Sequence, residues 1–188
     1  EFGTSGKGIA VIDGLDADLS RFCVRVVVRI ERAAQARQNL VESSRFPFAL
    51  FLEKGEQLGE TVVCATVRPT AHGWHAASTR FVRALEPGKW YSVDLVYDVD
   101  TLAIYIDGDI ATVQAFPDGR MTVLKGRDLY IGTWVDGVRY HFDGSMAALQ
   151  LVDGIPEALE GQLDECRNRP DWFISHKRVG VSASVDLG

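Results

Sequence analysis

The chain has 188 residues, of which 46% are hydrophobic and 24% are charged, and this size and composition suit one large domain with a buried core. The formal net charge is −6, so the chain lacks the basic footprint that nucleic acid or an anionic membrane would require. The most apolar stretch, residues 22–30, is interrupted by Arg25 and Arg29 and is far shorter than the ~20 residues that span a bilayer. We therefore expect no nucleic-acid partner and no membrane insertion.

The first half of the chain reads as a series of strands. Residues 8–14 are expected to form a short strand that ends in a turn, and residues 32–39 a loop. In residues 22–30 the even positions are all apolar, whereas the opposite row carries Arg25 and Arg29. This alternation predicts a long strand with one buried face and one partly exposed face. Further strands are expected at residues 40–44, 48–53, 60–68 and 72–79.

Residues 85–109 give the clearest local pattern. A Pro-Gly turn leads into alternating residues from Tyr91 to Tyr97, then a short polar turn at residues 98–100, then a second alternating run that ends in Asp107-Gly108. Two linked runs with a period of two predict an antiparallel hairpin. Its buried row should include Val93, Leu95, Ile104 and Ile106; outside the hairpin we also expect Ile131 and Leu149 in the core.

Three more strands are expected at residues 110–116, 128–134 and 142–152. Turn signals recur every 8–12 residues, which favours a β-sandwich or jelly roll. Residues 155–167 carry a proline near the start and apolar residues at helical spacing, and so predict a short helix. We therefore divide the chain into a β-domain at residues 8–154 and a tail at residues 155–188, which either packs on the sandwich or links it to other domains of a longer chain.

The hairpin resembles the middle hairpin of laminin-G-like domains, which are jelly rolls of the concanavalin A-like lectin/glucanase group. The matching motif is G-x-W-x-x-V-x-[LV]-x-Y-D, a short turn, and L-x-[IL]-Y-[IV]-D-G, found here between Gly88 and Gly108. Residues 8–19, 128–132 and 141–151 resemble the opening and closing strands of the same domains. The resemblance implies an all-β, two-sheet antiparallel jelly-roll sandwich with a short C-terminal helical tail. It also implies that Trp90 is a core residue.

In many domains of this fold, calcium joins the turn after the opening strand to the closing strand. The resemblance therefore implies calcium as a cofactor, with Asp13, Asp16 and Asp143 as ligands, since calcium prefers clustered oxygen atoms. These acids also fit as turn residues beside Gly14 and Gly144. Family domains usually carry acids where this chain has Ala147 and Ala148. Both interpretations of the three aspartates stay open.

Catalytic signatures are missing from the sequence. Glycoside hydrolases that share this fold place two carboxylates on one strand face, in the pattern E-x-D-x-E or E-x-D-x-x-E. One carboxylate acts as the nucleophile and the other as the acid. No stretch of this chain has either pattern, and no catalytic residue is assigned. Cys23, Cys64 and Cys166 have no metal-binding spacing and are interpreted as structural.

Aromatic side chains outside the expected core are the remaining binding candidates. Trp74, His75, Trp134 and Tyr140 lie near strand ends or loops, where they could bind a ligand by stacking. We therefore expect a non-catalytic module that binds a glycan or a protein partner, in a larger secreted or cell-surface protein. The alternatives are a divergent glucanase-like hydrolase or lyase and a structural accessory domain of a multidomain enzyme.

Overall fold

The computed structural model describes residues 10–16, 19–45, 47–55, 59–67, 77–81, 85–99, 101–115 and 124–168. One sheet contains six strands: β1 (Ala10–Ile12), β3 (Gln38–Ser43), β4 (Phe48–Lys54), β5 (Thr61–Val67), β6 (Ala77–Phe81) and β10 (Leu129–Ile131). The other contains five: β2 (Arg21–Ile30), β7 (Trp90–Asp98), β8 (Thr101–Ile106), β9 (Asp109–Ala115) and β11 (Gly144–Asp153). A single helix, α1 (Glu157–Arg167), follows the last strand in the described part of the chain.

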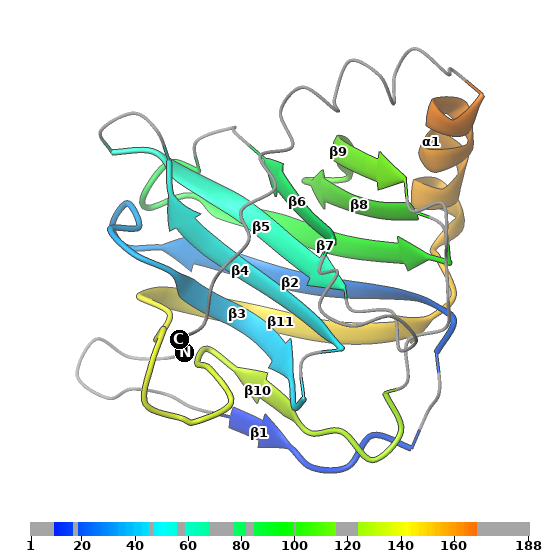
Figure 1. Cartoon of the computed structure of the whole chain (residues 1–188). Helices are drawn as coiled ribbons and strands as arrows, with labels where there is room; N and C mark the ends of the chain where they lie inside the picture. Colours follow the sequence, from blue (N-terminus) through cyan, green and yellow to red (C-terminus); the bar gives the residue numbers. More distant parts are fainter. Residues whose placement is uncertain are drawn as a thin grey trace.

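The two sheets lie face to face as a sandwich (Figure 1). The six-stranded sheet has the order β1-β10-β3-β4-β5-β6, and the five-stranded sheet has the order β11-β2-β7-β8-β9. Every described pairing is antiparallel, including the expected hairpin of β7 and β8, in which Leu95 lies opposite Ile104. The predicted two-sheet antiparallel sandwich is therefore confirmed, and the described strands all lie within residues 8–154.

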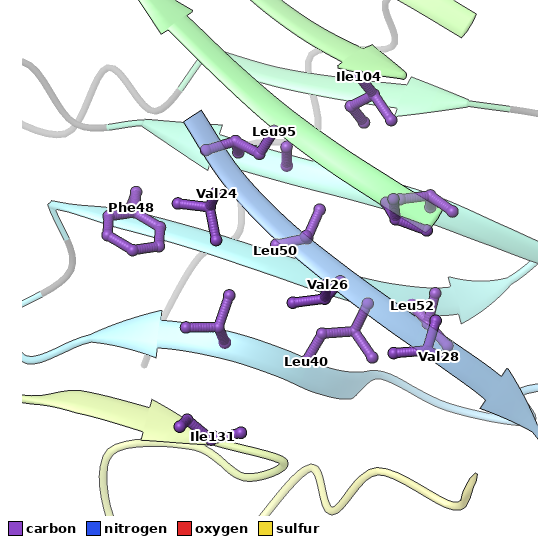
Figure 2. Packing of buried hydrophobic residues seen from close by; sticks show 14 of the residues in the cluster. Val24, Val26, Val28, Leu40, Phe48, Leu50, Leu52, Leu95, Ile104 and Ile131 are labelled. Atoms are coloured by element: carbon purple, nitrogen blue, oxygen red, sulfur yellow. The ribbon is translucent and has the colours of Figure 1, made fainter. Parts of the chain in front are cut away.

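The core lies between the sheets because alternate residues of each strand point inward. In Figure 2 the valines of β2, Val24, Val26 and Val28, meet Leu40 and Leu50 from the opposite sheet. Five of the predicted core residues are buried, namely Val93, Leu95, Ile104, Ile106 and Ile131. Leu149 is partly buried and packs against the same cluster.

The outward row of β2 includes three arginines, each of which lies opposite a residue of β7. Arg21 lies opposite Asp98 and donates to it at 2.7 Å. Arg25 lies opposite Asp94 and donates to it at 2.5 Å, which compensates a carboxylate that is fully buried. This face is partly exposed, as expected, and two of its arginines form cross-strand ion pairs.

The third pair of this row corrects one expectation. Arg29 lies opposite Trp90, and its guanidinium is 5.4 Å from the centroid of the indole ring. Trp90 is 45% exposed, so the core position implied by the family resemblance is wrong. The physical reason is the register of β7: Val93 and Leu95 point inward, and Trp90 therefore belongs to the row that points outward.

The helix α1 covers part of the outer face of the five-stranded sheet, beside β8 and β9 (Figure 1). Its buried residues Leu159, Leu163 and Cys166 contact Val96 and Tyr105 on that face, and the Tyr105 hydroxyl donates to the Leu159 carbonyl at 2.8 Å. The expected helix is confirmed and packs on the sandwich. In the described part of the chain, no helix is both long and apolar enough to cross a membrane.

We expect Leu95→Ala or Ile104→Ala to lower the free energy of unfolding by roughly 2–5 kcal/mol, because each leaves a cavity in a close-packed core. Denaturation with urea measures the effect. Val138→Ala is the control, since Val138 is 69% exposed and its replacement should change stability by less than about 0.5 kcal/mol. An unchanged midpoint in both core variants would show that the assigned facing of β7 and β8 is wrong.

Candidate functional site

The loop between β10 and β11, residues 132–143, is held in a fixed shape by backbone hydrogen bonds; we call it the aromatic loop. Its two ends are joined where the Phe142 N–H donates to the Gly132 carbonyl at 2.9 Å. Further out, the Trp134 N–H donates to the Arg139 carbonyl at 3.0 Å. The loop is also tied to the sheet, because the Asn39 N–H of β3 donates to the Tyr140 carbonyl at 2.8 Å.

The tip of the aromatic loop is a tight turn organised by Asp136. The Gly137 N–H donates to the Trp134 carbonyl at 2.8 Å, and Gly137 has a φ of 67°, which glycine adopts without strain. The Asp136 carboxylate accepts from the N–H groups of Val138 and Arg139 at 2.8 and 3.0 Å, and from Arg139 Nε at 2.6 Å. These hydrogen bonds, first that from Val138, lower the pKa of Asp136 to about 2.

Aromatic rings and guanidinium groups form a continuous series of contacts from the aromatic loop to β4. The Arg139 guanidinium is 3.8 Å from the centroid of Trp134, whose ring is 5.4 Å from that of Tyr140. Arg37 then lies 5.1 Å from Tyr140 and 3.9 Å from Phe51. We call these five residues the aromatic–arginine row. Each contact falls within the range of a cation–π or aromatic pair.

The row lies over the outer face of the six-stranded sheet. Asn39 is opposite Phe51, and Glu42 is opposite Ala49. Phe51 and Ala49 belong to a cluster separate from the main core, together with Val62 and Cys64. Because residues opposite each other in a sheet share a face, Asn39 and Glu42 also point away from the core, and an irregularity in register between Asn39 and Val41 separates them.

Glu42 of β3 connects the aromatic loop to the six-stranded sheet through hydrogen bonds. This carboxylate is only 2% exposed, and it accepts from Trp134 Nε1 at 3.1 Å and from Arg37 at 3.4 Å. Asn39 Nδ2 also donates to it. Burial raises the pKa of Glu42 to about 7, although the nearby Arg37 charge and the hydrogen bonds from Asn39 and Trp134 act in the opposite direction.

Two of the four predicted binding residues are brought together. Trp134 and Tyr140 are adjacent in the aromatic–arginine row and are both half-buried. One face of the Trp134 indole carries the Arg139 guanidinium, so this tryptophan supports the loop as well as forming part of its surface. Trp74 and His75 lie outside the described residues, and their role stays a prediction.

The three predicted calcium ligands do not lie together. Asp13 follows the end of β1, which aligns through Leu129 with Ser43 at the end of β3. The Asp143 N–H instead donates to Gln38 at the start of β3, at 3.0 Å. The two ends of this strand are roughly 15 Å apart. The residues present therefore do not fit a single metal site formed by all three.

Each end has its own charge partner. Asp143 accepts two hydrogen bonds from Arg32, at 2.9 and 2.7 Å. Asp16 lies 3.5 Å from Lys125. Among the described residues, no group of three or more His, Cys, Asp or Glu side chains is arranged to hold a metal. Cys23, Cys64 and Cys166 are buried and do not form disulfides.

Sequence reasoning missed the polar part of the site: Arg37, Asn39, Glu42, Asp136 and Arg139. The local signal for two of them was present in W-V-D-G-V-R, where an Asp-Gly turn follows a tryptophan and places an arginine back beside it. The contacts of Glu42 with Trp134 span 92 residues. No pattern within one segment could have revealed that pair.

The raised pKa of Glu42 predicts a loss of stability as pH rises. The unfolded chain releases this proton near the ordinary pKa of 4.5, whereas the folded protein keeps it to about pH 7. Between these values the folded state binds more protons, so this group's contribution to the free energy of unfolding decreases with pH. In urea denaturation from pH 4.5 to 8, the stability of the wild type relative to Glu42→Gln should fall up to about pH 7 and then level off. A difference that does not vary with pH would contradict the assigned pKa.

Calcium stays a prediction, and the separation of its proposed ligands sharpens the test. EDTA should lower the melting temperature and added calcium should restore it, because a ligand bound only to the native state stabilises that state. Asp143→Ala and Asp13→Ala identify which end responds, since the two carboxylates are not neighbours. A melting temperature that is indifferent to both chelator and calcium would remove the metal.

Solved structures with the same fold include several binding proteins. The native heptameric SAP-like pentraxin from Limulus polyphemus has a TM-score of 0.64 and 16% identity over 82% of this chain and 73% of its own. The Ruminococcus gnavus IT-sialidase CBM40 bound to α2,3-sialyllactose has a TM-score of 0.59 and 16% identity, over 80% and 95%. The botulinum neurotoxin serotype G binding domain has a TM-score of 0.60 and 12% identity, over 88% and 48%, so this chain spans about half of it.

Identities this low show a shared fold and nothing more specific. No curated protein matches the chain. A family model described as "Concanavalin A-like lectin/glucanases superfamily", of laminin G type, matches residues 3–160. This match agrees with the sandwich topology and with the motifs of the central hairpin, and it confirms the resemblance. The chain therefore belongs to the concanavalin A-like lectin/glucanase superfamily, as a laminin-G-like jelly-roll domain.

Proposed function

We propose that this domain is a non-catalytic module that binds carbohydrate through the aromatic–arginine row. The observation that carries the proposal is the row itself: two half-buried rings, Trp134 and Tyr140, flanked by guanidinium groups on a loop that is fixed at its ends, its tip and its base. Rings held in place can stack on the apolar face of a sugar with little loss of side-chain entropy.

A comparison of the two outer faces of the sandwich supports this location. On the five-stranded sheet, α1 and the Arg–Asp pairs of β2 and β7 already occupy much of the outward surface. On the six-stranded sheet, the aromatic–arginine row extends from the outward side of β4 to the aromatic loop. The tip of this loop is exposed, since Val138 is 69% exposed. The neighbours in fold add support, since one of them, the CBM40 of a sialidase, is bound to α2,3-sialyllactose.

A hydrolase remains the alternative with a specific observation in its favour, because a carboxyl group with a pKa of about 7 is what a general acid needs. Against it, both oxygens of Glu42 are engaged by Trp134, Asn39 and Arg37. The other buried carboxylates of the described residues, Asp94 and Asp98, lie on the opposite sheet and pair with arginines. The arrangement therefore favours binding over hydrolysis.

We further propose that the domain belongs to a secreted or cell-surface protein.

We expect a glycan array to show binding, and Trp134→Ala or Tyr140→Ala to weaken it roughly two- to tenfold, the worth of one aromatic contact. Trp90→Ala is the matched control, because Trp90 is an exposed tryptophan beside an arginine on the opposite sheet. Melting temperatures show that the variants remain folded.

Unchanged binding in the folded Trp134 and Tyr140 variants would move the site elsewhere, with Trp74 the next residue to replace. Failure to bind any glycan would contradict the carbohydrate assignment and favour a protein partner or an accessory role. Release of reducing sugar from β-glucans or galactans that survives stringent purification would overturn the non-catalytic assignment.

A further inference from the structure

We infer that the ligand of the aromatic–arginine row is an acidic saccharide, whose carboxylate or sulfate group accepts hydrogen bonds from Arg139 and Arg37. This inference rests on the proposed function, and it adds the charge class of the ligand. It follows from counting which donors and acceptors of the site are already engaged within the protein.

The donors are in surplus. A guanidinium carries five N–H groups and no acceptor. Arg139 donates from Nε to Asp136, while its two terminal nitrogens donate to no acceptor among the described residues. Its side chain is 58% exposed. Arg37 donates from Nε to Asn39 Oδ1 at 2.8 Å and from Nη2 to Glu42; its Nη1 has no partner in the described ranges.

The side-chain acceptors of the site, by contrast, are largely engaged within the protein. The Glu42 carboxylate accepts from Trp134, Asn39 and Arg37. The Asp136 carboxylate accepts two backbone N–H groups and Arg139 Nε, and the side-chain oxygen of Asn39 accepts from Arg37. A neutral sugar presents hydroxyls that both donate and accept, so its donors would find few partners here.

A carboxylate or sulfate group only accepts, and its paired oxygens match the fork of a guanidinium. The charges agree with this match. The negative charge of Asp136 offsets the positive charge of Arg139, to which it is hydrogen-bonded within the turn. Burial raises the pKa of Glu42 to about 7, so at neutral pH the Glu42 carboxylate offsets the positive charge of Arg37 only in part. Although the formal net charge of the chain is −6, Arg139 presents an exposed guanidinium beside the rings of this row.

The two arginines contact different rings of the row, Trp134 for Arg139 and Tyr140 for Arg37. The aromatic faces would therefore hold the sugar ring while one guanidinium, or both, holds its acidic group. Stacking supplies affinity that does not depend on charge, whereas the arginines distinguish an acidic sugar from its neutral counterpart. Replacing an arginine should remove the discrimination and leave the weaker stacking contribution.

Calorimetry with matched pairs of probes tests the inference: α2,3-sialyllactose against lactose for a carboxylate, and dextran sulfate against dextran for a sulfate. At low salt, the acidic member of at least one pair should bind tenfold or more tightly, the approximate worth of a charged hydrogen bond. The preference should shrink as salt is added. The pair that shows it identifies the acidic group.

The variants Arg139→Gln and Arg37→Gln should each reduce the preference several-fold. Arg139→Lys should restore only part of it, because lysine keeps the charge but not the fork. Arg29→Gln is the matched control, since Arg29 lies beside Trp90 on the opposite sheet, and it should keep the full preference. Arg139 is exposed, so its variants should fold even where Arg37→Gln lowers the melting temperature.

The outcomes separate this inference from the proposed function. Equal binding of acidic and neutral probes, with loss in Trp134→Ala, would keep the binding module and overturn the acidic ligand. A preference that survives in the folded Arg139 and Arg37 variants, or that disappears in Arg29→Gln as well, would also overturn it. Absence of binding to any acidic or neutral probe, together with a blank glycan array, would overturn both.

Discussion

The shared core between the two sheets constrains every other feature of this domain. Each strand has one row of side chains inside the sandwich, so its other row must lie on an outer face. In β2 this rule places Val24, Val26 and Val28 in the core and the arginines outside. In β3 and β4 it places Leu40 and Leu50 inside, and Asn39 and Phe51 outside. The proposed binding surface is thus the reverse side of the same strands that stabilise the fold.

The two outer faces of the sandwich are covered in different ways. On the five-stranded sheet, α1 buries one part and cross-strand ion pairs cover another, with Asp98 accepting from both Arg21 and Arg167. On the six-stranded sheet, the aromatic loop folds back over β3 and leaves rings and guanidinium groups at the surface. A buried carboxylate, Glu42, is what connects this loop to the strand beneath it.

The fold was predictable because its signals are local. The alternation of residues 91–97 and 102–106 placed both strands and most of their buried residues correctly, and the spacing of Leu159 and Leu163 placed the helix. Trp90 shows the limit of motif matching, since a residue shared with a family motif was assigned to the core while the register of its own strand points it outward.

The site was predictable only in its aromatic part. Trp134 and Tyr140 are visible as loop aromatics in the sequence, but two of their partners are far away in the chain: Arg37 immediately before β3, and Glu42 within β3. The irregularity in register at Asn39 and Val41, which sets where Asn39 and Glu42 point, has no sequence signature of its own. The aspartates predicted to bind calcium were assigned from turn motifs, and motifs do not measure the distance between the two ends of a strand.

The 92-residue separation of Glu42 and Trp134 also bears on how the domain forms its proposed binding surface. Contacts between distant segments form only after the intervening chain has closed a large loop, which is slow compared with forming a hairpin such as β7–β8. The pairing of β3 with β10 is what brings the aromatic loop to its base. During synthesis the β3 side of the surface emerges long before its counterpart, so recognition of a ligand would begin only when nearly the whole sandwich has been made.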